Sequence, residues 1–210
     1  MRVVYVSKAL VVGAYQRKLE ELVRVPGLEL TAIVPATWQE GRTALHLERA
    51  HTAGYELIIA PLAFNGQFHL HFYPTLGRLL RRLRPDVLHM DEEPYNLATW
   101  HALAAGARTG ARSLFFTWQN LSRRYPWPFR RIEQVNYRRA AYALAGNQDA
   151  VAVLRGKGYT GPVAVIPQFG VDPELFAPEP RPDNPHFTIG YAGRLVPEKG
   201  VDVLLRACAR

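Results

Sequence analysis

Short apolar runs rich in β-branched residues alternate along this chain with longer amphipathic segments. Apolar runs of this length are typical of buried parallel strands, and amphipathic segments between them are typical of the helices that join such strands. The alternation predicts an α/β fold, with a parallel sheet and flanking helices. The expected strands are residues 3–6, 30–34, 57–60, 87–89, 114–116, 142–145 and 163–166.

The clearest helical pattern covers residues 75–83. Leucines recur there at the spacing of one helix face, arginines lie off that face, and Pro85 follows as a stop signal. The leucines of the expected buried face are Leu76, Leu79, Leu80 and Leu83.

The net charge of +8 comes almost entirely from arginine, because only four residues are lysine. Such a surface favours anionic partners, whether phosphorylated substrates, acidic lipid or nucleic acid.

The single cysteine, Cys208, gives no sign of an oxidising compartment and is expected in the core. No run approaches the ~18 uninterrupted apolar residues of a membrane span, since Ser7 and Lys8 interrupt the N-terminal one. We therefore expect a cytoplasmic protein, or one that lies on the inner face of the membrane.

A cluster of prolines separates two parts of the chain. Six prolines fall between residues 167 and 185, which indicates an ordered crossover or linker. We expect an N-terminal domain over residues 1–166, a linker over 167–186, and only the first strand and helix of a second α/β domain over 187–210. That strand is expected at residues 187–191 and that helix at residues 200–209.

The segment GYAGRLVPEKG near the C-terminus has the residue types of a diphosphate clamp. Gly193 lets the chain turn after a strand, Arg194 can make a two-pronged contact, and Lys199 sits near a helix start, which attracts phosphate. Gly200 completes the segment. The motif is neither a Walker loop nor a dinucleotide fingerprint. A glycine turn with solvated basic side chains is an equally simple interpretation.

Together with VAVIPQFGVDPELF at residues 163–176, this segment resembles the interdomain region of retaining glycosyltransferases of family 4, which have the GT-B fold. The linker of that family reads approximately I-P-N-G-V-D followed by a phenylalanine. Gln168 and Phe169 stand where the family has one asparagine. The positions that match are Ile166, Pro167, Gly170, Val171, Asp172 and Phe176.

The resemblance implies two Rossmann-like domains that face each other across a cleft, with the nucleotide sugar on the C-terminal domain and the acceptor on the N-terminal one. It implies that Gly193, Arg194, Lys199 and Gly200 hold the donor diphosphate and stabilise the leaving group, so that no metal or other cofactor is required. The carboxylate motif E-x7-E of the family would lie beyond Arg210. Catalytic residues are therefore not assigned in this chain.

The activity implied by the resemblance is transfer of a sugar, with retention of anomeric configuration, from a nucleotide-diphosphate donor to a glycan or a lipid-linked acceptor. Such an enzyme would suit bacterial polysaccharide or glycolipid assembly, and this chain by itself would be inactive. Two alternatives remain open: a non-catalytic module that binds a glycan or a membrane surface, and a nucleotide-sugar epimerase with the same architecture.

Three acids follow the strand expected at residues 87–89. Asp91, Glu92 and Glu93 would lie at the carboxyl end of a parallel strand, where α/β folds bind ligands. They could contact acceptor hydroxyls. They could equally favour a helix N-terminus, with Pro94 as the first helical residue.

The run SLFFTWQN, residues 113–120, resembles the next strand of the family and its active-site turn, where many relatives carry a histidine that touches the donor sugar. Gln119 replaces that histidine, and Asn120 follows it. A glutamine can position a sugar but cannot titrate near neutral pH.

Gly13, in the first loop, would border the acceptor cleft. Gly13, Gln119 and Asn120 could each also be ordinary loop structure.

The stretch SRRYPWPFRR, residues 122–131, interleaves arginines with aromatic residues. Such a mixture suits anionic lipid headgroups, and the residues expected to make that contact are Arg124, Trp127, Phe129 and Arg130. A loop with packed aromatics and solvated arginines is the alternative. No nucleic-acid-binding signature accompanies the stretch, so nucleic acid is not expected as a partner.

His69 and His71 flank Leu70 and could be a pair of metal ligands. Two histidines without a nearby third ligand make a poor metal site, so we expect packing or acceptor contact there, and no bound metal.

Overall fold

The computed structural model describes residues 1–178, 185–193 and 195–209. The chain divides into two compact units, Met1–Gly170 and Val171–Arg210, and each is described by itself.

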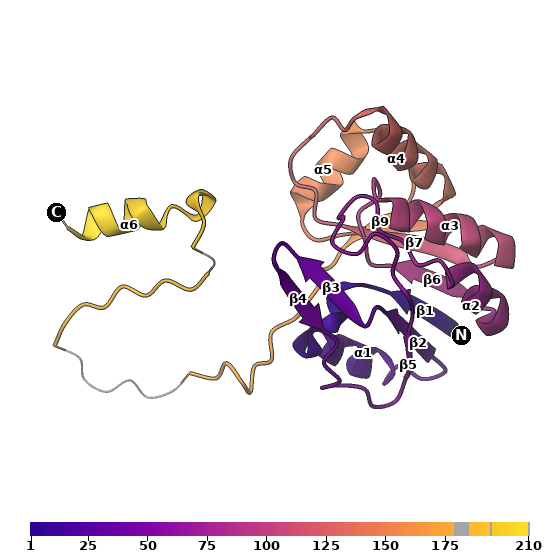
Figure 1. The fold of residues 1–210 in the computed structure, drawn as a ribbon, viewed down its shortest axis with the longest axis horizontal. Helices are drawn as coiled ribbons and strands as arrows, with labels where there is room; N and C mark the ends of the chain where they lie inside the picture. Colours follow the sequence, from indigo (N-terminus) through magenta and orange to yellow (C-terminus); the bar gives the residue numbers. More distant parts are fainter. Residues whose placement is uncertain (179–184, 194, 210) are drawn as a thin grey trace. The chain divides into compact units, whose positions relative to one another are not determined.

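The first unit is built on a seven-stranded sheet with the order β5-β2-β1-β6-β7-β8-β9, in which every neighbouring pair is parallel (Figure 1). Each of the seven strands expected within residues 1–166 is present, with its ends shifted by one or two residues at most. The fold is therefore α/β and Rossmann-like, as the sequence predicts. The strands are β1 (Arg2–Val6), β2 (Glu29–Val34), β5 (Glu56–Ile59), β6 (Val87–Met90), β7 (Arg112–Thr117), β8 (Tyr142–Ala145) and β9 (Val163–Val165).

Helices cover both faces of this sheet. Because side chains alternate along a strand, Val4 and Val6 of β1 join the core that contains Leu76 and Ala98, while Tyr5 joins the core that contains Leu19 on the other face. The helices are α1 (Arg17–Leu22), α2 (Leu76–Leu83), α3 (Leu97–Thr109), α4 (Trp127–Arg139) and α5 (Gln148–Gly156), with 3-10 turns η1 (Ala9–Val11) and η2 (Gly13–Gln16).

Helix α2 confirms the leucine pattern. Leu76 and Leu80 are fully buried, and Leu79 and Leu83 pack against the same core. The helix ends at Arg84, which has a left-handed backbone with φ 46° and ψ 59° just before Pro85.

An antiparallel hairpin, β3 (Thr37–Glu40) and β4 (Thr43–His46), was not expected from the sequence. Its signal is the short turn Gly41–Arg42 between two runs of four residues. Neither run has the continuous apolar character of the strands of the main sheet.

The order of the strands reverses direction between β1 and β6. The chain moves from β1 to β2 and β5 on one side, and from β6 to β7, β8 and β9 on the other. In sheets of this kind, ligands bind outside the carboxyl ends of the strands at such a switch point. The residues after Val6 and after Met90 therefore occupy the position where a site is expected.

The second unit contains η3 (Pro197–Lys199) and α6 (Val201–Cys208). Helix α6 confirms the helix expected at residues 200–209. The prediction of a strand at residues 187–191 is wrong, because no described segment pairs with these residues. A strand needs a partner for its backbone N–H and C=O groups. Cys208 is exposed, so its expected place in a core is also wrong. None of the helices in the described parts of the chain has the length and apolar character to cross a membrane.

Candidate functional site

Asp91, Glu92 and Glu93 lie directly after β6, at the switch point of the sheet. They do not cap a helix: α3 begins at Leu97, and its N-cap is Asn96. The prediction that Pro94 is the first helical residue is therefore wrong. The segment between β6 and α3 instead holds three carboxylates, each with its own set of partners.

Asp91 is buried and receives bonds from three separate segments. Ser7 Oγ donates to Oδ2 over 2.9 Å, Gln168 Nε2 donates to Oδ1 over 2.9 Å, and the Lys18 ammonium lies 3.5 Å from Oδ2. Burial lowers the pKa of Lys18, and the charge of Asp91 opposes that effect. Asp91 thus ties together β1, α1 and the residues that follow β9.

Glu92 is held by a second lysine. Lys8 forms an ion pair with Oε1, His71 Nε2 lies 3.5 Å from the same oxygen, and Asn96 donates to Oε2 over 3.2 Å. Burial alone would raise the pKa of Glu92, but Lys8 and His71 outweigh it and lower the pKa to about 2. The Lys8 ammonium also lies 4.7 Å from the centre of the Phe68 ring.

Glu93 differs from its two neighbours because no lysine pairs with it among the described residues. Thr117 Oγ1 donates to its Oε2 over 2.6 Å, and the backbone N–H of Trp118 donates to its Oε1 over 2.8 Å. Burial raises the pKa of Glu93 to about 7, although these hydrogen bonds act in the opposite direction. The charge of Glu93 therefore changes near neutral pH.

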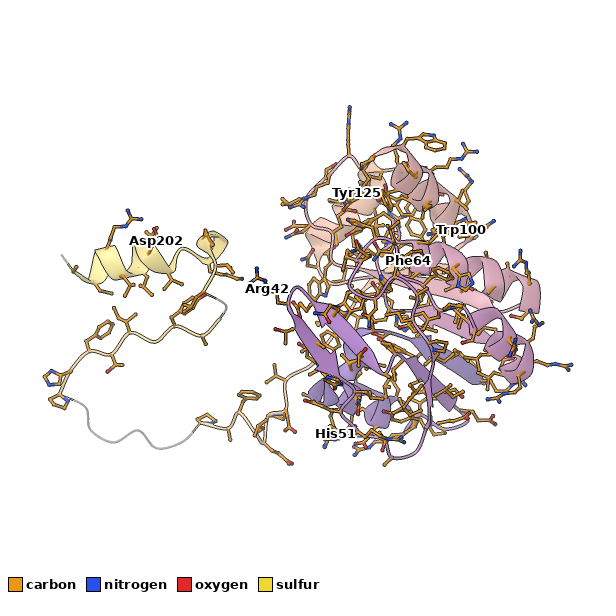
Figure 2. All side chains as sticks on the ribbon, in the orientation of Figure 1. Arg42, His51, Phe64, Trp100, Tyr125 and Asp202 are labelled. Atoms are coloured by element: carbon orange, nitrogen blue, oxygen red, sulfur yellow. The ribbon has the colours of Figure 1, made fainter. Side chains whose placement is uncertain are left out.

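A pocket of about 170 Å³ opens beside Glu93. Its wall joins the end of β7 to the segment that leads into α4, where Tyr125 is labelled in Figure 2. The lining residues are Glu93, Tyr95, Trp118, Gln119, Asn120, Leu121, Arg123 and Tyr125.

Gln119 is one of the residues that line this pocket. Lys157 donates to Gln119 Oε1 over 3.2 Å, and the same ammonium donates to Glu133 over 2.7 Å. Since Lys157 has no acceptor to offer, the amide must face it with oxygen. Gln119 Nε2 is then buried without a hydrogen-bond partner among the described residues. An orphaned donor in a pocket wall is suited to a ligand oxygen.

Gln168 and Phe169, which replace the single asparagine of the family linker, both make contacts within the first unit. Trp118 Nε1 donates to Gln168 Oε1 over 2.7 Å, so Gln168 bridges Trp118 and Asp91. The Phe169 ring stacks on Tyr15 with centroids 3.9 Å apart, and the Lys18 ammonium lies 4.4 Å from the Phe169 ring. Gln168 and Phe169 therefore fix this segment against the residues at the carboxyl edge of the sheet.

The structure brings Asp91, Glu92, Gln119 and Asn120 to the carboxyl edge, as the sequence predicts for neighbouring parallel strands. Gly13 lies in η2 and is buried. Its N–H donates to Glu48 over 2.6 Å, and an added Cβ would come 2.7 Å from Ala50. The close backbone approach at Gly13 is thus to residues 48–50.

Of the expected diphosphate clamp, Arg194 lies outside the described residues. Lys199 is exposed and ends η3, and Gly200 is the N-cap of α6 with φ 65°. Gly193 has φ 155°, and an added Cβ would come 2.8 Å from the Tyr191 hydroxyl. Both glycines therefore have conformations that other residues rarely adopt.

The basic aromatic stretch is part loop and part helix, because α4 begins at Trp127. The Phe129 ring faces inward, 5.1 Å from the ring of His69. Trp127 is 74% exposed, and Arg124 and Arg130 are exposed. Three of the four residues expected to touch a membrane thus face solvent.

His69 and His71 have separate partners. His69 Nδ1 lies 3.2 Å from Asn96 Oδ1, and His71 Nδ1 lies 2.9 Å from the carbonyl oxygen of Phe68. In the described parts of the chain, no group of three or more His, Cys, Asp or Glu side chains is arranged to hold a metal ion.

Sequence reasoning did not single out Lys8, Lys18 and Trp118 as site residues. A signal was present for the lysines, because two of the four in the chain lie within the first 18 residues. Lys8 comes just after a buried strand, and a lysine there must find a carboxylate in the fold. The direction of the Trp118 ring depends on contacts far away in the sequence, and no local pattern indicates it.

Comparison with known proteins supports one family. The family model described as Glycosyltransferase Family 4 matches residues 19–175. The fold is similar to that of Anabaena Alr3699/HepE in complex with UDP and glucose, with a TM-score of 0.53 and 14% identity over 86% of this chain and 47% of that one. It is also similar to sucrose-phosphate synthase (tll1590) from Thermosynechococcus elongatus, with a TM-score of 0.53 and 11% identity over 80% of this chain and 48% of that one.

This chain therefore spans about half the length of the two solved structures. A search of curated proteins gave no match. Because the family model covers most of the residues of the first unit, the chain belongs to glycosyltransferase family 4.

Proposed function

We propose that this protein transfers a sugar from a nucleotide-diphosphate donor to a hydroxyl group of a glycan or a lipid-linked sugar. Residues 1–170 would hold the acceptor at the carboxyl edge of the sheet. Family membership supports the transferase class. The observation that carries the acceptor role is the pocket beside Glu93, where the buried Gln119 amide has a donor without a partner among the described residues.

The chemistry of this pocket suits a sugar. Sugars present many hydroxyl groups on a ring with apolar faces, so their sites combine an aromatic surface with a few placed polar groups. The Trp118 ring supplies the surface, Gln119 Nε2 supplies a donor, and Glu93 supplies an acceptor. With a pKa of about 7, Glu93 is partly ionised near neutral pH and would orient an acceptor hydroxyl.

The ion pairs of Asp91 and Glu92 would hold this pocket in place. Each carboxylate is paired with its own lysine and accepts further hydrogen bonds, which fix its position. Their fixed positions set the backbone at Glu93. We therefore assign Asp91 and Glu92 as positioning residues.

The donor would be held by the other domain of the enzyme. The structure of Alr3699/HepE contains UDP and glucose, which supports a nucleoside diphosphate sugar as the class of donor. Lys199, together with Arg194, would neutralise the diphosphate as it leaves, without a metal ion. On this proposal the chain by itself transfers no sugar, and transfer proceeds with retention of anomeric configuration.

Calorimetric titration tests the acceptor role. Mono- and disaccharides are titrated into the chain, and Gln119→Met is compared with the matched surface change Gln148→Met. Loss of sugar affinity in Gln119→Met alone supports the proposal, and equal affinity in both variants contradicts it. Titration of UDP and GDP sugars gives the second arm: tight binding to the chain would contradict the proposal that the other domain of the enzyme holds the donor.

A further inference from the structure

A second hollow lies at the opposite edge of the same sheet. Arg2 is the first residue of β1, Arg112 is the first residue of β7, and Asp86 directly precedes β6 between them. The hollow has a volume of about 730 Å³, which falls within the range of small-molecule sites, roughly 300–1,000 Å³. The proposed sugar pocket lies at the carboxyl ends of these strands, so the two sites are separate.

Arginine dominates the lining of this hollow. Five arginines and one aspartate give it a net charge of +4, out of +8 for the whole chain. Asp86 accepts a 2.7 Å hydrogen bond from the backbone N–H of Arg2 and pairs with its guanidinium at 4.0 Å. In the described parts of the chain, the other four arginines form no ion pair with a carboxylate. They are Arg81, Arg84, Arg108 and Arg112.

Helix dipoles account for part of this charge. Arg81 lies in the last turn of α2 and Arg108 in the last turn of α3, where a cation is favoured by the carbonyl end of the helix. Arg84 is the C-cap of α2 and lies at the same carbonyl end, whereas Arg112, the first residue of β7, is not at a helix end. Arg84 has a left-handed backbone, which favours glycine and costs other residues about 1 kcal/mol. An arginine at such a position points to a use for its side chain.

We propose that this hollow, lined by Arg2, Arg81, Arg84, Arg108 and Arg112, binds a small soluble anion that carries two or more phosphate groups. Guanidinium groups form paired hydrogen bonds with phosphate oxygens, and several in one hollow suit a multiply charged ligand. Among the described residues of the lining, Pro85 is the sole hydrophobic side chain, and it is buried. A hollow without exposed apolar side chains fits a soluble anion better than a lipid surface.

Titration of inorganic tripolyphosphate into the chain tests the proposal. The key variant is Arg84→Gly with Arg112→Gln: glycine suits the left-handed backbone of residue 84, so the fold is retained, and two guanidinium groups are lost. We expect the dissociation constant to rise at least tenfold. The matched control is Arg138→Gln, an exposed arginine in the last turn of α4, which should bind tripolyphosphate as the native chain does.

Two further arms separate this site from other sources of phosphate binding. Lys199→Ala removes the lysine of the proposed donor clamp, so tripolyphosphate that still binds this variant binds outside the clamp. Vesicles of phosphatidylglycerol should not compete with tripolyphosphate. Unchanged affinity in the double variant, loss of binding in Lys199→Ala, or displacement of tripolyphosphate by the vesicles would each overturn the proposal.

Discussion

Gln168 donates a 2.9 Å hydrogen bond to the buried carboxylate of Asp91, although 77 residues separate them in the sequence. Asp91 follows β6, at the switch point, and Gln168 follows β9, at the edge of the sheet. The same Gln168 side chain accepts a bond from the Trp118 indole. One amide therefore joins the acids of the switch point to the wall of the proposed sugar pocket.

Replacing Gln168 by alanine should loosen this wall. The change removes a donor from a buried carboxylate, which costs about 1–3 kcal/mol, and leaves the Trp118 indole without its acceptor. We expect a lower free energy of unfolding in urea and a shifted indole N–H resonance of Trp118. Gln148→Ala, at an exposed position in α5, should change neither quantity. An unmoved Trp118 resonance in Gln168→Ala would show that the bridge does not position the ring.

Replacing Lys8 by methionine should be strongly destabilising. The Glu92 carboxylate is buried, and without its lysine it becomes an uncompensated charge, at a cost of about 3–5 kcal/mol. Adding Glu92→Gln to Lys8→Met removes that charge and should restore most of the lost stability. Urea unfolding of the two single variants and the double variant gives the coupling free energy. A double variant no more stable than Lys8→Met would refute the ion pair as the cause.

The dependence of the free energy of unfolding on pH should reveal the raised pKa of Glu93. Its pKa is about 7 in the folded chain and 4.5 ordinarily, so between these values the unfolded chain releases a proton that the folded chain keeps. The contribution of Glu93 to stability is therefore present below pH 4.5 and is lost as pH rises to about 7, by about 3 kcal/mol. Glu93→Gln should lack this loss. Parallel pH profiles of the native chain and the variant would contradict the raised pKa.

Gly146 offers a steric test of the position of Trp118. A Cβ at residue 146 would come 2.2 Å from the Trp118 ring, so Gly146→Ala must displace the ring from the pocket and from Gln168. We expect reduced sugar binding and a shifted Trp118 indole resonance. Gly156→Ala is the matched control, because an added Cβ meets no atom within 4 Å there. Retained sugar affinity in Gly146→Ala would mean that Trp118 is not part of the sugar site.

The sheet could be predicted from the sequence because its strands appear as short, continuous apolar runs, and the central ones are largely buried. Tyr142–Ala145 was predicted to the residue. The hairpin at residues 37–46 was not expected, because its strands lack a continuous apolar run. Residues 187–191 show the reverse error: an apolar run indicates a strand, but the run forms one only beside a partner.

For the candidate site, the sequence predicts only which residues follow the end of each strand. The position of Asp91 after β6 follows from the run before it, and this alone places the acid at the carboxyl edge. The difference between Glu92, with a pKa of about 2, and Glu93, with a pKa of about 7, arises from Lys8 and from burial. That difference depends on packing between segments 84 residues apart, which no local pattern contains.

Saturation-transfer NMR between the chain and a panel of mono- and disaccharides tests the acceptor role of residues 1–170 most directly. The account predicts transfer of magnetisation to at least one sugar at millimolar concentration, lost in Trp118→Ala and retained in Arg138→Gln. Signals of equal strength in Trp118→Ala, or no transfer to any sugar of the panel, would contradict the assignment of the pocket beside Glu93 as the acceptor site.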